Sequence, residues 1–330
     1  MSNRLQTLRP SVWTSIRNLN STKSGKSLTE TTIPDIRGNW YYSVEVLKAL
    51  DGNEMRVENT LETSPTMMNV SQNGHFVLLQ LPVDPTRSEA GVLSGVLKKA
   101  PGQPWKLHVS DYDDNGIFEY TQTELGWRGV YLEAGNIGSK EQSTTAGIPL
   151  LARSVDDLNA LKNETDNDVP QIAGEWLYHA ELLKKIGGKD IRVGDRETLG
   201  PAPVALKQKG RFVSVNALGG LLAGVFHKDA DQSWNLYVAD HADNGHYRFQ
   251  STPYGWEATY IERGEKGSAD QTATAGRVLL AKSDSQLQKM IENKGNNVPQ
   301  LPASLVYEAQ VLYAPNETAL NNPSKEKQTW

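Results

Sequence analysis

An internal repeat constrains the fold of this chain more than any other feature of its sequence. Residues 33–42 return as residues 169–178, an offset of 176 − 40 = 136, and later matches lie 234 − 105 = 129 residues apart. The matched positions are mainly glycines and aromatic residues, among them Gly38/Gly174, Trp40/Trp176, Trp105/Trp234, Trp127/Trp256 and Tyr131/Tyr260. A repeat of this length predicts two copies of one folding unit.

The repeat divides the chain into four expected parts. Residues 33–168 form module 1 and residues 169–297 form module 2, each ending in a short helix. Residues 1–32 carry five basic residues against one acidic residue and show no periodicity, so we expect a flexible basic arm. Residues 298–330 open the motif a third time, with an expected orphan strand over 303–313, and continue as a polar tail.

Within each module apolar residues recur with a period of two, which is typical of half-buried strands. In the first strand the apolar set is Trp40, Tyr42, Val44 and Val46 in module 1, and Trp176, Tyr178, Ala180 and Leu182 in module 2. Further strands are expected near 56–62, 66–71, 75–81, 91–98, 116–123 and 148–153, separated by turns rich in Gly and Asn-Gly.

Eight or nine short antiparallel strands with one apolar face favour a closed barrel, because closure buries the apolar face and leaves no unpaired edge strand. The expected fold is therefore all-β, with two tandem up-and-down antiparallel β-barrels. A short helix follows each barrel, because Ser154 and Ser283 stand three residues before Asp157 and Gln286, as in a capping box.

The composition narrows the classes of function. The 330 residues include no cysteine, which excludes disulfides, thiolate catalysis and cysteine-based metal sites. A net charge of −5 argues against nucleic-acid binding. A mean hydropathy of −0.53 without a long apolar run argues against a membrane span. No secretory signal is recognisable, so a cytoplasmic location is the default expectation, with leaderless export left open.

Three short motifs resemble those of lipocalins. Residues 38–41 resemble the G-x-W motif of the first strand, residues 109–112 the T-D-Y motif, and residues 150–154 the third motif with its arginine. Module 2 matches at Gly174, Trp176, Asp240 and Leu280, but it departs from the pattern at His241 and Lys282. An extra strand expected near Trp127 also departs from the lipocalin pattern. The chain resembles avidin-like barrels as a second choice, so the resemblance is best assigned to the wider calycin-type group.

The resemblance implies a barrel whose mouth holds a small, often apolar molecule. It also implies that Arg153 stacks on Trp40 to close the barrel floor, an arrangement based on cation–π attraction.

We therefore expect each barrel to bind a small apolar or aromatic molecule without chemistry, and without a metal or cofactor. The expected contact residues lie on the inward phase of their strands. They are Trp40, Tyr42, Trp105, Asp111, Trp127 and Tyr131 in module 1, and Trp176, Tyr178, Trp234, Asp240, Trp256 and Tyr260 in module 2. Aromatic side chains in such numbers are what a lined pocket needs.

Other candidate sites have simpler structural interpretations. The pattern Asp111-x-Asp113-x-Asn115-Gly116 matches the start of a calcium-binding EF-hand loop, but Gln122 stands where the loop needs glutamate, so an acidic hairpin turn is favoured. Four of the six histidines lie in module 2, and we interpret them as surface residues: His179, His227, His241 and His246.

Three other functions stay open at this point. A tandem lectin would bind a glycan on exposed Trp and Tyr faces and gain from avidity. An assembly protein would use strand 303–313 for strand addition to a neighbour, giving a homo-oligomer. A lipocalin-like isomerase or cyclase would need a polar residue deep in a barrel, for which Asp111 and Asp240 are the candidates.

Overall fold

The structure is a computed structural model. It describes residues 32–50, 56–58, 60–82, 91–111, 116–134, 143–164, 168–186, 196–217, 220–229, 231–240, 244–262, 272–293 and 309–312. Asp35–Trp330 forms one compact unit, distinct from Met1–Pro34. Among the described residues, no helix is long and apolar enough to cross a membrane.

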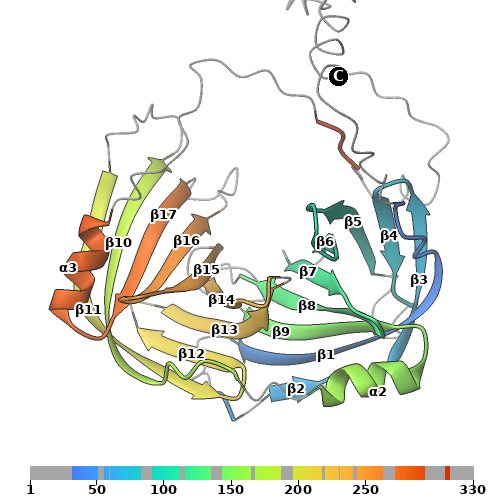
Figure 1. The fold of residues 1–330 in the computed structure, drawn as a ribbon, viewed down its shortest axis with the longest axis horizontal. Coiled ribbons are helices and arrows are strands. Elements are labelled where there is room, and N and C mark those ends of the chain that lie inside the picture. Colours follow the sequence, from blue (N-terminus) through green and yellow to red (C-terminus); the bar gives the residue numbers. More distant parts are fainter. Residues whose placement is uncertain are drawn as a thin grey trace, which may run out of the picture. The chain divides into compact units, whose positions relative to one another are not determined.

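Module 1 folds as a closed antiparallel barrel (Figure 1). Its strands are β1 (Gly38–Leu50), β2 (Thr60–Glu62), β3 (Thr66–Asn73), β4 (Phe76–Gln80), β5 (Val92–Lys99), β6 (Trp105–Asp111), β7 (Gly116–Gln122), β8 (Gly126–Glu133) and β9 (Ser143–Ala152). Neighbours in sequence pair as hairpins from β3 onward, and β1 pairs with β9 to close the sheet, with Tyr41 opposite Ala152.

Module 2 repeats this topology with eight strands. They are β10 (Gly174–Ile186), β11 (Arg196–Lys209), β12 (Phe212–Ala217), β13 (Gly220–Lys228), β14 (Trp234–Asp240), β15 (Gly245–Thr252), β16 (Gly255–Glu262) and β17 (Thr272–Ala281). The barrel closes between β10 and β17, with Leu177 opposite Ala281. These are the repeat equivalents of the residues that close barrel 1. The expected fold of two tandem barrels is confirmed.

A helix follows each barrel, as the capping residues predict. Helix α2 (Val155–Asn163) begins after Ser154, and helix α3 (Asp284–Glu292) begins after Ser283. Each serine hydroxyl accepts a hydrogen bond from a backbone N–H three residues later, that of Asp157 or Gln286. This side-chain cap satisfies one of the N–H groups that a helix start leaves without a helical partner.

Three strand predictions need correction. The strand expected near 56–62 covers only Thr60–Glu62, because residues 57–58 form a turn. The last strand of module 1 begins at Ser143, five residues before the expected start, because Ser143–Gly147 pairs with the end of β1 without carrying an apolar alternation. Of the expected strand 303–313, only residues 309–312 are described, and they form no strand. Each barrel is already closed, so neither closing pair offers this segment a free edge on which a ladder would form.

The two barrels pack against each other through their outer faces. An apolar cluster joins outward side chains of β9 and helix α2 to outward side chains of β13 and β14. It contains Leu47, Ala146, Ile148, Leu150, Leu158 and Leu161 from module 1, and Phe212, Ala223, Val225, Tyr237 and Ala239 from module 2. Burial of this many apolar groups makes the pair of barrels one folded unit rather than two linked domains.

Candidate functional site

One end of each barrel is plugged by a tryptophan under a cation. The Arg153 guanidinium lies 4.0 Å from the Trp40 ring centre, and the Lys282 ammonium lies 4.0 Å from that of Trp176. The Trp40 indole N–H donates to the Ile36 carbonyl at 2.7 Å. The arrangement that the lipocalin resemblance implies for Arg153 is confirmed, and it closes this end of the barrel, which we call the plugged end.

The other paired tryptophans also lie toward the plugged end, because Trp105 and Trp127 stand at the starts of β6 and β8. All are buried or nearly so, with Trp127 only 2% exposed. Trp234 is partly buried and packs edge-on to Phe226. The indoles therefore point inward as predicted; their contact with a ligand stays a prediction. Five of the six rings are buried, so stacking of a sugar on them would be limited to the partly buried ring of Trp234.

The half of the barrel 1 lumen farther from the plugged end is polar, and we call it the open end only to distinguish it from the plugged end; the loops that border it lie outside the described residues. The Tyr131 hydroxyl donates to Oε2 of Glu133 at 3.0 Å, and the Thr145 hydroxyl donates to the same oxygen at 2.9 Å. Glu133 is only 6% exposed. Asp111 ends β6 near this group, and burial together with its charge raises the pKa of Tyr42.

Barrel 2 repeats the two carboxylates and the tyrosine of β8 as Asp240, Glu262 and Tyr260, and it adds Tyr247 where barrel 1 has Phe118. The Tyr260 hydroxyl donates to Glu262 at 3.4 Å, and the Tyr247 hydroxyl donates to Asp240 at 3.2 Å. Burial, followed by the charge of Asp240, raises the pKa of Tyr178 to about 12. Burying carboxylates in an apolar barrel is costly unless they are hydrogen-bonded. Their presence in both copies therefore marks the open ends as candidate sites.

The cavity that the described residues line inside barrel 2 is small. It measures about 30 Å³ and is lined by aliphatic and aromatic side chains such as Tyr178, Leu236 and Tyr247. That volume accepts one or two waters, well below the size of a typical ligand pocket. A ligand in this lumen would therefore have to sit at the open end or displace the aromatic side chains.

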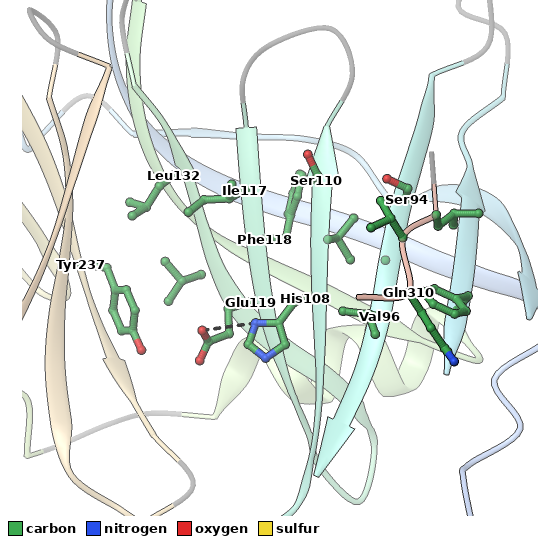
Figure 2. Close-up of a pocket in the computed structure, with 16 residues that line it drawn as sticks. Ser94, Val96, His108, Ser110, Ile117, Phe118, Glu119, Leu132, Tyr237 and Gln310 are labelled. Atoms are coloured by element: carbon green, nitrogen blue, oxygen red, sulfur yellow. Dashed lines mark ion pairs between the residues drawn. The ribbon is translucent and has the colours of Figure 1, made fainter. Parts of the chain in front are cut away.

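A much larger pocket lies outside barrel 1. It measures about 470 Å³ and is lined by outward side chains of β5 to β8, by Tyr237 of barrel 2 and by residues 310–312. Figure 2 shows Val96, Ile117 and Leu132 on its wall, with Tyr237 on one flank and Gln310 on the other. The wall is mainly apolar, and its size falls within the usual range for small-molecule sites.

The polar groups of this pocket centre on His108. Its Nδ1 lies 3.6 Å from Oε2 of Glu119 on the neighbouring strand, and Lys106 pairs with the same carboxylate. Burial lowers the pKa of His108, although the charge of Glu119 acts in the opposite direction. Two serines, Ser94 and Ser110, face each other across β5 and β6. The pocket therefore offers donors and acceptors beside an apolar wall.

The position of this pocket follows from the repeat. Val96 is the counterpart of Val225, which is fully buried against barrel 1 in the apolar cluster between the barrels. Leu312 has the repeat position of Leu47, which belongs to the same cluster. The pocket therefore lies on the surface of barrel 1 that corresponds to the covered surface of barrel 2.

Comparisons with known proteins add little. No family model matches the chain, and no curated protein matches it. Two solved structures resemble it weakly. One is a protein of unknown function from the DUF3598 family of Nostoc punctiforme (10% identity, 75% of this chain and 96% of that one, TM-score 0.28). The other is the di-domain ARO/CYC BexL from the BE-7585A biosynthetic pathway (10% identity, 69% and 78%, TM-score 0.16).

No family follows from these matches. At TM-scores this low neither structure carries an argument. What stands is the pair of closed eight-stranded barrels, with β2 pairing outside the ring of barrel 1, and each barrel has a cation over its floor tryptophan.

Sequence reasoning missed several residues of these sites. His179 and His227 are buried rather than on the surface as expected, with exposed fractions of 6% and 4%. The pairing of modules hides His227, and no period or motif signals such pairing. Most of the EF-hand-like stretch, residues 112–115, lies outside the described residues, as does His241. Tyr120, whose buried hydroxyl has no partner within the described residues, also went unnoticed.

Proposed function

We propose that this chain binds a small, largely apolar molecule without chemistry, in the pocket on the outer face of barrel 1. One observation carries the proposal: a 470 Å³ pocket with an apolar wall and a few converging polar groups. Such pockets use the apolar wall for affinity and the polar groups for orientation. Val96 and Leu132 would supply the wall, and His108 with Glu119 would orient a polar end of the ligand.

The geometry around His108 favours binding over hydrolysis. A catalytic serine needs a base within hydrogen-bonding distance. Among the residues that the structure describes, no hydrogen bond joins His108 to Ser94 or Ser110. His108 instead faces Glu119 at 3.6 Å.

The open ends of the two barrels are the second location that we propose for the ligand. The specific support is the pair of carboxylates found at the same positions of both modules, with Asp111 and Glu133 in barrel 1 and Asp240 and Glu262 in barrel 2. A ligand there would present a hydrogen-bond donor to the carboxylates and an apolar part to the aromatic rings.

A tryptophan-quenching screen, repeated by thermal shift, tests both locations with hydrophobic ligands and free sugars. Val96→Arg fills the outer pocket, and Val155→Arg is its matched control because the two valines are 39% and 38% exposed. We expect Val96→Arg to abolish saturable binding and Val155→Arg to preserve it.

The remaining outcomes are equally informative. Binding that survives Val96→Arg but is lost in Asp111→Asn with Asp240→Asn places the ligand at the open ends. Saturation by a sugar alone favours a lectin. If no apolar ligand binds the wild-type chain, the proposed function is wrong.

A further inference from the structure

A different pocket lies where the outer faces of the two barrels meet. It measures about 280 Å³ and is predominantly polar in its side chains. Its lining comes from both modules: Pro104, Thr121, Gln122, Thr123, Arg128 and Glu164 from module 1, and Arg211, His227, Lys228, Asp229 and Gln232 from module 2. It shares no lining residue with the pocket described above.

Basic groups dominate this pocket. Arg128 pairs with Glu164 at 3.2 Å, and Arg211 lies over the Trp234 ring, 5.2 Å from its centre. Asp229 is the other carboxylate of the lining, but it already accepts hydrogen bonds from Asn235 and Tyr237 and pairs with an arginine that does not line the pocket. The lining itself thus carries three cationic side chains against two carboxylates, and one of the cations, Lys228, pairs at 2.7 Å with Asp168 outside the lining.

Two neutral side chains aim polar atoms into the same place. His227 is 4% exposed, and neither of its ring nitrogens has a hydrogen-bond partner within the described residues. The Thr121 hydroxyl, on a side chain 9% exposed, also has no partner there. A buried polar atom without a partner is costly and calls for an explanation, such as a ligand that supplies the missing bond.

We propose that this inter-barrel pocket binds an oxyanion, the phosphate or carboxylate group of a small molecule. Arg128 and Arg211 supply charge-assisted hydrogen bonds, which suit the oxygens of such a group. The Thr121 hydroxyl and one ring N–H of His227 donate the remaining bonds.

The titration behaviour of the lining agrees with this assignment. Burial, followed by the positive charge of Arg128, lowers the pKa of Arg211 to about 9. Burial also lowers the pKa of His227 to about 3, so its ring is neutral at pH 7. A bound anion would oppose both effects.

The pairing of the two modules creates the site, because neither module carries it alone. The repeat counterparts of Arg211 and His227 in barrel 1 are His75 and Lys98, and the counterpart of Arg128 in barrel 2 is Glu257. Arg128 and Thr121 come from the outer face of barrel 1, and Arg211 and His227 from the outer face of barrel 2, so the site forms where these two faces meet. The site is therefore independent of binding at the outer pocket or the open ends.

Titration calorimetry with inorganic phosphate tests the proposal. We expect saturable binding that Arg211→Gln weakens by about tenfold or more, as expected for loss of a charge-assisted hydrogen bond. Arg196→Gln is the matched control, since Arg196 is exposed at the start of β11. Acetate and citrate, titrated at the same ionic strength, separate a preference for carboxylate from one for phosphate.

A second measurement does not depend on the folding of an arginine variant. The ring signals of His227 should shift on addition of phosphate to the wild-type chain, while chloride at equal ionic strength leaves them unchanged. The proposal is overturned if phosphate, acetate and citrate all fail to saturate, or if Arg211→Gln and Arg196→Gln bind equally well.

Discussion

Replacing Gly126 by alanine tests how closely the neighbouring strands β8 and β9 of barrel 1 approach each other. Gly126 has φ +155°, and an added Cβ would lie 2.1 Å from the backbone oxygen of Leu151. Non-bonded heavy atoms normally stay about 3.5 Å apart, and the obstacle is backbone rather than a movable side chain. The two strands must separate by more than 1 Å, which we expect to cost on the order of 4 kcal/mol.

Gly74→Ala is the matched control. Gly74 has φ +58°, and nothing lies within 4 Å of an added Cβ. Alanine there should therefore lower the free energy of unfolding only by the cost of a left-handed backbone, roughly 1–2 kcal/mol. Thermal unfolding followed by circular dichroism should show a fall in Tm of about 10 °C for Gly126→Ala and only a few degrees for Gly74→Ala. Equal falls for the two variants would refute the close approach of β8 and β9.

Three further predictions follow from the described contacts. Arg153→Ala removes the cation over Trp40 and a hydrogen bond to the Asn39 carbonyl, and it should lower the free energy of unfolding in urea by about 1 kcal/mol. Because burial lowers the pKa of His227 to about 3, its contribution to stability is complete above pH 6.5 and is lost as the pH falls toward 3; His227→Gln should flatten that part of the stability curve in phosphate-free buffer. Deletion of residues 298–330 should leave the mass measured by light scattering at that expected for an unchanged oligomeric state, since both barrels close without this segment; a changed state would support strand donation.

The fold could be predicted from the sequence because the repeat shows the same alternation of apolar and polar residues twice. A single alternating stretch is ambiguous, but the same alternation around Trp40 and Trp176 fixes the buried face twice. The serine caps and the Arg153–Trp40 contact were also predictable, because they depend on residues at fixed short spacings or on a shared motif. The strands expected at 56–62 and 303–313 were wrong in the described residues, and the start of β9 was missed because Ser143–Gly147 lacks apolar alternation.

The candidate sites were harder to predict from the sequence, because they depend on which outer faces of the two barrels contact each other. Val225 and Val96 occupy equivalent positions in their modules, yet one is buried between the barrels and the other is 39% exposed on a pocket wall. No local pattern separates them. His227 likewise has the outward phase of a surface residue, and only the neighbouring barrel removes it from solvent.

The outer faces of the two modules differ in charge at equivalent positions. Ile148 of β9 belongs to the apolar cluster between the barrels, whereas its counterpart Arg277 in β17 bonds both carboxylate oxygens of Glu257, at 2.7 and 3.1 Å. A partner packed on this part of β17 would have to bury an ion pair, which carries a desolvation cost. Three of the described residues 309–312, namely 310–312, line the pocket beside Val96, on the surface of barrel 1 that is equivalent to the covered surface of barrel 2.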